Sequence, residues 1–309
     1  MSKGIITIAT GKKQYIHMAK MLAVSLKLNY PVLPIAVITD SEDTELRSLY
    51  DFIISADMTK GNGYIQKLNM YEYSPFDETI FIDVDCMVVK NIDFLWGLFK
   101  DEHVSVIGFK QNTGHHFGTS IDNLCKYFKI DDILIFNGGM YYFKKDSIAQ
   151  SVFEKARQLI YEYEELGFAK VRGTSINEEP LMSIGMSLHN MQPVFDNWKG
   201  MHMACGSIGE VDLDVLKGRC MFQKNGFTVK PAVMHYGGTS YNKFYYRREA
   251  AKLRLAYFFK VPKRVTSLLV NGFYNPLYIL YIFSYRLART FFKGVPLKFS
   301  PLMPYNFYE

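Results

Sequence analysis

The chain has 309 residues, of which 49% are hydrophobic and 21% charged, so it is long enough to bury a large core. This composition excludes a disordered or low-complexity chain. The net charge of +6 suits phosphate-bearing ligands or an anionic membrane surface, and by itself it does not distinguish them.

The cysteines and the amino terminus favour a reducing compartment. A strand-like run follows Met1-Ser2-Lys3-Gly4 directly, where a secretory signal would carry a longer apolar stretch. The four cysteines contain no C-x-x-C pair: Cys86, Cys125, Cys205 and Cys220. We therefore expect a cytoplasmic protein with reduced thiols.

The first ninety residues alternate between β-branched runs and helical periodicity. The pattern predicts strands at residues 5–10, 34–39, 52–54 and 79–84, and helices at 15–28, 44–50 and 64–73. This order is typical of a mostly parallel sheet with helices on both faces, whose ligands bind beyond the carboxyl ends of the strands. Because Thr10, Asp40 and Asp83 all stand at such ends, we expect one crevice to collect them.

The strongest chemical signal is Asp83-Val84-Asp85, which lies between two apolar runs. Two carboxylates at i and i+2 of an extended segment point to the same side. Their hard oxygens suit Mg²⁺ or Mn²⁺, and two buried charges need a cation or hydrogen-bond donors. A divalent ion that joins both carboxylates to a diphosphate meets this need. The alternative is an Asp that caps the next helix, beside an incidental neighbour.

The middle of the chain mixes strands, helices and polar loops. The pattern predicts a strand at 103–109, a polar loop at 111–118, an apolar segment at 133–143, helices at 147–166 and within 176–189, and a strand at 232–234. Four motifs here each allow a structural and a functional interpretation. Asn137-Gly138-Gly139 is a turn or a sugar contact, and Glu178-Glu179 is a solvated helix start or a contact to the sugar or the acceptor. His115-His116 is a polar loop or a lid, and His235 is a strand-end histidine or a metal ligand.

The tail beyond Tyr241 is basic and aromatic, and residues 265–285 carry no charge. As a helix this segment would be about 30 Å long, which is enough to cross a bilayer core. Its centre holds four residues that disfavour such insertion: Asn271, Gly272, Asn275 and Pro276. We therefore predict two short helices on an anionic membrane surface, or a helical extension packed on the domain. The expected division is a catalytic domain at 1–245 and a helical extension at 246–309.

Three sequence segments together resemble glycosyltransferase family 8, the group of glycogenin and the bacterial lipopolysaccharide galactosyltransferases. They are Lys67-Leu68, Phe81-Ile82-Asp83-Val84-Asp85 and Asn91-Ile92-Asp93-Phe94-Leu95. Thr10 and Tyr15, before a helix ending in Ser25-Leu26, fit the same pattern. The resemblance is continuous over roughly residues 4–100, and later it is confined to Asn137-Gly138-Gly139, Glu178-Glu179 and His235-x-x-Gly238.

The resemblance implies an α/β GT-A fold, a single Rossmann-like domain with a mostly parallel mixed central sheet. It also implies a Mn²⁺ ion (or Mg²⁺) held by Asp83, Asp85 and His235. A nucleoside-diphosphate sugar would lie across the metal, with the base near Thr10 and Tyr15. The residues implied in donor binding are Thr10, Tyr15, Asp40, Lys67, Asp83, Val84, Asp85, Asn137, Gly138, Gly139, Gly238 and Lys243.

Two departures from the family pattern concern the sugar and the phosphate. The family's lysine after His-x-x-Gly stands closer to the histidine than Lys243 does here, and it precedes Pro-Trp. The family's Asp-Gln pair is replaced by Glu178-Glu179, so the donor sugar stays open. We expect Glu178, Glu179 and Asn137 to be the catalytic residues.

The sequence thus predicts a Mn²⁺-dependent, retaining glycosyltransferase that uses a UDP-sugar. We expect a saccharide or glycolipid acceptor and a peripheral position on the inner face of a membrane. The alternatives are a nucleotidyltransferase, hinted at by Gly11-Lys12-Lys13, and a non-catalytic module that binds nucleotide sugars. A nucleic acid is a weaker candidate partner for the basic tail.

Overall fold

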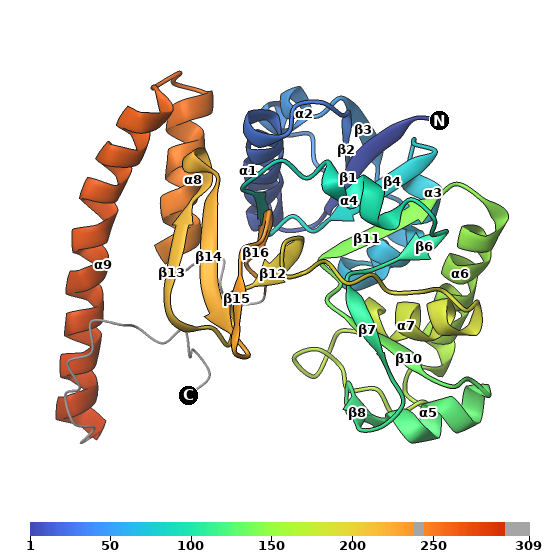
Figure 1. The fold of residues 1–309 in the computed structure, drawn as a ribbon. Helices are drawn as coiled ribbons and strands as arrows, with labels where there is room; N and C mark the ends of the chain where they lie inside the picture. Colours follow the sequence, from blue (N-terminus) through green and yellow to red (C-terminus); the bar gives the residue numbers. More distant parts are fainter. Residues whose placement is uncertain (238–243, 294–309) are drawn as a thin grey trace.

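A six-stranded mixed sheet forms the centre of the protein in the computed structural model, which describes residues 1–237 and 244–293 (Figure 1). The strand order is β3-β2-β1-β4-β11-β6. Neighbours among the first four strands run parallel, and β11 is antiparallel to both of its neighbours. The strands span Lys3–Ala9 (β1), Ile35–Thr39 (β2), Phe52–Ser55 (β3), Glu78–Ile82 (β4), Val104–Ser105 (β6) and Met140–Lys144 (β11). The predicted mostly parallel sheet is confirmed.

Both faces of this sheet are buried, which explains the nearly continuous apolar strands in the sequence. Along β1, Ile5 belongs to one core cluster and Ile6 to the other, and Ile80 and Phe81 of β4 alternate in the same way. Figure 1 shows α1 on one face and α6 and α7 on the other. The helices of this body are α1 (Lys13–Asn29), α2 (Thr44–Leu49), α3 (Met70–Tyr73), α4 (Phe94–Phe99), α5 (Ile121–Phe128), α6 (Ser147–Gln158) and α7 (Glu178–Leu188).

Smaller sheets surround the central one. The sheet of β12 (Met201–Met203), β16 (Val233–His235) and β5 (Cys86–Val88) extends from the turn after β4. A second three-stranded sheet contains β13 (Ile208–Asp214), β14 (Arg219–Lys224) and β15 (Phe227–Val229). Two strand pairs complete the set: β7 (Gly108–Gln111) with β10 (Ile133–Phe136), and the hairpin of β8 (His115–His116) with β9 (Thr119–Ser120). Short 3₁₀ helices are η1 (Met58–Lys60), η2 (Gly63–Asn69), η3 (Leu159–Glu162) and η4 (Val215–Lys217).

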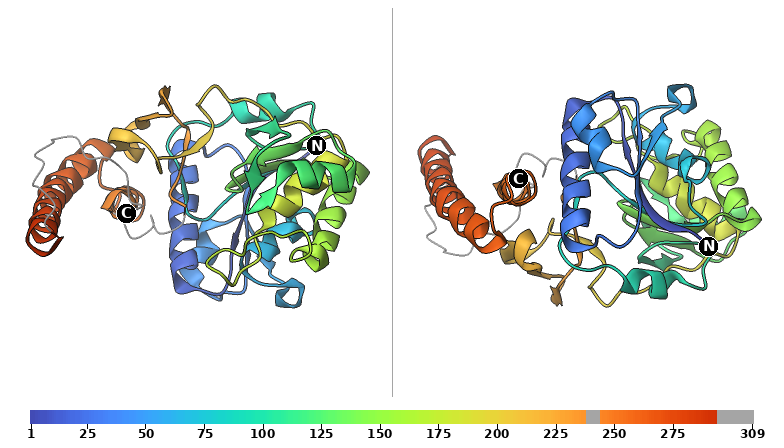
Figure 2. Two further views of the ribbon diagram at one scale, coloured as in Figure 1. Left: turned by 90° about the horizontal axis from the view of Figure 1, so that it is seen from below. Right: turned by 90° about the horizontal axis from the view of Figure 1, so that it is seen from above.

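Two helices follow the sheets: α8 (Phe244–Tyr257) and α9 (Lys263–Lys293). Figure 1 places α8 between α1 and α9, and both views of Figure 2 place α9 at the edge of the molecule, away from the central sheet. Tyr246 and Leu253 of α8 belong to the same core cluster as α1. The division expected at 245/246 therefore falls inside a helix that is packed on the body.

Several predicted elements have different limits in the structure. The strand predicted at 79–84 ends at Ile82, and the strand at 103–109 is two strands in different sheets. The helix predicted at 147–166 is α-helical only to Gln158 and continues as η3.

The prediction of two short helices between residues 265 and 285 is wrong, because α9 is one helix of 31 residues with Pro276 inside it. Tertiary contacts on both sides of the proline compensate for the hydrogen bond that it removes. The Phe244 ring stacks on Tyr278 at 4.1 Å, and Arg248 donates to Asn275 Oδ1 at 3.3 Å. Within the described residues, no helix is both long and apolar enough to cross a membrane.

Candidate active site

Asp83 and Asp85 stand in a turn, and not on the extended strand expected from the sequence. The strand β4 ends at Ile82, and Cys86 N donates to Asp83 O at 3.0 Å, which closes the turn before β5. The two carboxylates consequently take different partners. Asp83 pairs with Lys67, and Asp85 pairs with His235.

Lys67 is a buried cation between two carboxylates. Its Nζ lies 2.7 Å from Asp83 Oδ2 and 2.9 Å from Glu178 Oε1, and it donates to Gly138 O at 3.0 Å. Burial alone would lower the pKa of this ammonium, but Asp83 and Glu178 raise it well above its ordinary value. Lys67 therefore stays charged, and its three partners hold it in one position.

Glu178 and Glu179 begin α7, and Glu178 is only 1% exposed. The interpretation as a solvated helix start is therefore wrong for Glu178, and Glu179 is partly buried. Burial raises the pKa of Glu178 to about 7, although Lys67 opposes the shift, and burial also raises the pKa of Glu179. Glu178 Oε2 meets no hydrogen-bond donor among the residues that the structure describes. A buried carboxylate oxygen without a donor is a candidate contact for a ligand hydroxyl.

Asn137-Gly138-Gly139 connects these groups through its backbone. Because β11 is antiparallel to β4, the start of β11 meets the end of β4, and Gly139 O accepts from Asp83 N at 2.9 Å. Gly138 N donates to Glu179 Oε1 at 2.8 Å. A Cβ on Gly138 would lie 2.6 Å from Glu178 Oε1, so only glycine permits this close approach.

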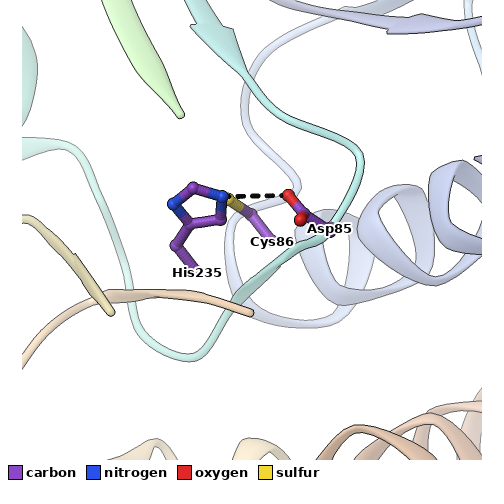
Figure 3. A group of neighbouring side chains, drawn as sticks. All are labelled: Asp85, Cys86 and His235. Atoms are coloured by element: carbon purple, nitrogen blue, oxygen red, sulfur yellow. Dashed lines mark ion pairs between the residues drawn. The ribbon is translucent and has the colours of Figure 1, made fainter. Parts of the chain in front are cut away.

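Asp85, Cys86 and His235 form a second group beside the first (Figure 3). The strand β16 is antiparallel to β5 and places His235 opposite Cys86. His235 Nε2 lies 3.0 Å from Asp85 Oδ1, and the ligand atoms of all three residues lie within 4.8 Å of one another. Burial lowers the pKa of His235, but the Asp85 carboxylate outweighs it and raises the pKa above its ordinary value. In return, His235 offsets the burial of Asp85 and keeps its pKa low.

The donor set of this second group fits a divalent cation. A carboxylate and an imidazole suit Mn²⁺, whereas burial raises the pKa of Cys86 well above its ordinary value and keeps the thiol protonated. Among the residues that the structure describes, the region is also short of positive charge, because four carboxylates face one lysine and one histidine: Asp83, Asp85, Glu178 and Glu179 against Lys67 and His235. Asp83 lies outside the group in this structure because its carboxylate is paired with Lys67.

The residues expected to contact the nucleotide stand at neighbouring strand ends. Thr10 follows β1, which pairs with β4, and Asp40 follows β2. Both Asp40 oxygens accept from Gly11 N at 3.1 Å, and Gly11 has a φ of +79°, which favours glycine. Tyr15 lies in the first turn of α1 and is partly buried. Gly238 and Lys243 lie outside the described residues.

Three further residues that the sequence analysis named also have defined positions. Val84 is buried in the turn. His115 and His116 form β8, the first strand of the β8–β9 hairpin, and His116 is buried, with its pKa lowered to about 4 by burial.

Sequence reasoning missed Tyr64, whose ring centroid lies 5.8 Å from Lys67 Nζ, and Met203, whose sulfur accepts from Asn137 Nδ2 at 3.1 Å. The i, i+3 spacing of Tyr64 and Lys67 on a helical turn was a usable signal for Tyr64, whereas nothing local marked Met203.

The comparisons with known proteins give a structural match only. No protein-family model and no curated protein matches the chain. A crystal structure of an active-site mutant of LgtC aligns with a TM-score of 0.51 and 13% identity, over 76% of this chain and 87% of LgtC. The galactosyltransferase LgtC in complex with donor and acceptor sugar analogues aligns over the same shares, with a TM-score of 0.50 and 14% identity.

This chain has the GT-A glycosyltransferase fold. The fold that the family resemblance implies is thus confirmed. Within the GT-A fold, both groups of side chains lie where β4 ends, and this edge of an α/β sheet is where ligands bind. At these identities the match establishes the fold, and any activity follows from the chemistry of the site.

Proposed function

We propose that this protein is a glycosyltransferase that moves a sugar from a UDP-sugar to a saccharide or glycolipid acceptor, with Mn²⁺ or Mg²⁺ and with retention at the anomeric carbon. One observation carries the proposal: buried Lys67, His235 and four carboxylates converge at the carboxyl end of β4 in a GT-A fold. A fixed ammonium next to a metal-ligand pair suits a reaction whose leaving group is a diphosphate.

The proposed roles follow from the contacts. Asp85 and His235 would hold the divalent ion, with Asp83 as a further ligand. When bound, this ion supplies Lewis-acid stabilisation of negative charge on the leaving diphosphate. Lys67 adds a second positive charge, and its partners keep it from moving during the reaction.

The buried carboxylates suit the sugar side of the donor. Glu178 and Glu179, with Asn137, would orient the sugar and stabilise positive charge at its anomeric carbon. In a retaining reaction the anomeric bond to the diphosphate breaks and a bond to the acceptor oxygen forms on the same face. The proton of the acceptor hydroxyl passes to the departing phosphate oxygen, so no additional base is needed.

The remaining donor contacts are proposed from their places at the same edge of the sheet. Thr10 and Tyr15 would face the base, and Asp40 the nucleoside. The backbone around Asn137-Gly138-Gly139 and Val84 would line the diphosphate and the sugar. Gly238 and Lys243 would complete the phosphate site. In this proposal residues 1–245 form the catalytic domain, and 246–309 carry it to an acceptor on the inner face of a membrane.

The test is Mn²⁺-dependent release of UDP from a panel of UDP-sugars by the purified full-length protein. Wild type should turn over at least one sugar. Lys67→Met should lose roughly 10²–10³-fold in rate, and Asp85→Asn should lose Mn²⁺-dependent UDP binding. Asp101→Asn is the matched control, because its side chain is 83% exposed, and it should behave as wild type.

Two outcomes count against the proposal. If Asp85→Asn binds UDP and Mn²⁺ as tightly as wild type, the assigned metal site is wrong. If wild type binds UDP but consumes none of the sugars, the protein is a binding module and not a transferase.

A further inference from the structure

The helix α9 has two opposite faces. Thr266, Ser267 and Val270 are buried, and they lie on the side that is packed against η4 and α8. Successive residues rotate by about 100° around a helix, so residues 265, 268, 276, 279 and 283 lie on the opposite side.

The solvent-exposed part of α9 is apolar, and it is broader than this opposite side. Its large side chains are between 46% and 75% exposed: Val265, Leu268, Leu269, Phe273, Leu277, Ile279, Leu280 and Phe283. From 265 to 283 they extend over about 27 Å of helix. We call these eight residues the outer face of α9. An exposed apolar surface of this length marks a binding site or an aggregation hazard.

Contacts of other α9 residues hold this helix against the rest of the protein. Ser267 Oγ donates to Asp214 Oδ1 at 3.2 Å, and Asp214 pairs with the fully buried Lys252 of α8 at 3.0 Å. Beyond Pro276, Tyr278 stacks on Phe244. These contacts occur along half of α9, so the outer face has a defined direction relative to the sheet.

The sequence around α9 carries charge of one sign. From residue 250 to residue 308 the sequence contains nine Lys or Arg residues and no Asp or Glu. At the amino-terminal end of α9, Arg264 and Lys217 line a cleft of about 670 Å³ together with Asn271 and Asn275. Two cations and two amides beside an apolar face match the phosphate and the acyl chains of an anionic phospholipid.

We propose that the outer face of α9 lies in the plane of a membrane interface that contains anionic phospholipid, with Arg264 and Lys217 at the headgroups. A second copy of the chain is a poorer occupant, because a symmetric contact through this face would place like charges together. The proposal concerns where the protein resides, and it does not depend on the transferase activity proposed above.

The first test is co-sedimentation of the full-length protein with vesicles of phosphatidylcholine alone or mixed with phosphatidylglycerol. Wild type should bind the anionic vesicles, and bind neutral ones at least about tenfold more weakly. Leu269→Glu combined with Leu280→Glu should reduce binding at least about tenfold. Tyr161→Glu is the matched control, because Tyr161 is 90% exposed and belongs to η3, far along the chain from α9, and it should bind as wild type. Unchanged thermal unfolding of each variant shows that the fold is kept.

The second test distinguishes insertion from simple charge attraction. Phe273→Trp places a reporter on the outer face, and brominated lipids should quench its fluorescence in anionic vesicles. Equal vesicle binding by wild type and the double glutamate variant would overturn the proposal, and so would an unquenched Trp. A wild-type dimer that the glutamates dissociate, without vesicle binding, would assign the face to a contact between copies.

Discussion

At the scale of single residues, Lys67 offsets the free-energy cost of burying the carboxylates of the site. A carboxylate as buried as Glu178 is expensive unless a cation or donors are close, and Lys67 supplies the cation for both Glu178 and Asp83. The two consecutive glycines beside these side chains are constrained by close contacts. Gly138 and Gly139 let the backbone approach the carboxylates and the histidine more closely than any other residue would allow.

Gly139→Ala should disable the proposed metal site while the fold persists. The added Cβ would lie 2.7 Å from His235 Nδ1 and 2.9 Å from Met201 Sδ, so the imidazole must leave the position in which it pairs with Asp85. We expect at least about tenfold weaker Mn²⁺ binding, measured by titration calorimetry with UDP present. The free energy of unfolding should fall by about 1–3 kcal/mol, because the contact is overpacked.

Gly97→Ala is the matched control for this substitution. Gly97 lies in α4, its added Cβ would meet nothing within 4 Å, and its φ is not positive. Alanine there should leave Mn²⁺ binding unchanged and stabilise the protein by up to about 1 kcal/mol. Normal Mn²⁺ affinity in Gly139→Ala would show that His235 does not bind the ion.

At the scale of elements, a buried charge network joins α8 and α9 to the strand β13. Glu249 Oε2 accepts from Val215 N at 2.8 Å, and Glu249 Oε1 lies 2.7 Å from Arg248 Nε and 2.9 Å from Lys252 Nζ. Lys252 also pairs with Asp214, the last residue of β13. These contacts explain why α8 and α9 are part of the packed body and not a loosely attached tail.

Lys252→Met should destabilise the protein by roughly 3–5 kcal/mol in chemical denaturation, because Asp214 is left buried without its cation. In wild type the pKa of Asp214 is lowered, against its burial, by Lys252. Its contribution to stability is therefore present above its ordinary pKa and is lost as the pH falls through the lower folded value.

The pH dependence gives this prediction a second readout. Without Lys252, burial should raise the pKa of Asp214, so the variant should recover part of its deficit as the pH is lowered toward 4. The exposed Lys100→Met serves as control and should change stability by less than about 0.5 kcal/mol. A loss in Lys252→Met that does not vary with pH would point to lost packing and not to lost charge pairing.

At the scale of the whole molecule, the two core clusters share the strands of one sheet, and the site lies at the edge where those strands end. A ligand that binds there as proposed would contact β4, β11, β16 and α7 through the residues described above, so its binding free energy should stabilise the entire fold. Mn²⁺ with UDP at about 100 times the dissociation constant should add about 2.7 kcal/mol.

In a chain of this size, that stabilisation should raise the melting temperature by roughly 2–4 °C. Calorimetric scans of wild type with Mn²⁺ alone, UDP alone and both together measure the effect, with Asp85→Asn as the comparison. The rise should require both ligands and be absent in the variant. An equal rise in Asp85→Asn would place the binding elsewhere on the molecule.

Much of the fold followed from local pattern. The first four strands and the first two helices were predicted to within a few residues, because their apolar periodicity reflects the two buried faces of the sheet. The helix predicted at 64–73 is the 3₁₀ helix η2 followed by the short α3, and β5 was not predicted. The GT-A class followed from the family resemblance over roughly residues 4–100, which includes Asp83 and Asp85. The segment from Met201 to Val229 was not predicted, because its short strands carry no pattern that distinguishes them from loops.

The sequence alone determined the order of the elements, and hence that Thr10, Asp40 and Asp83 stand at one edge of the sheet. Only the tertiary structure decided which charges pair. Lys67 meets Glu178 across more than a hundred residues, Asp85 takes His235 and not Asp83 as its neighbour, and α9 stays continuous through Pro276. The reason is physical: local sequence sets backbone preference and the spacing of apolar residues, whereas burial and charge pairing depend on surfaces that meet only when the chain is packed.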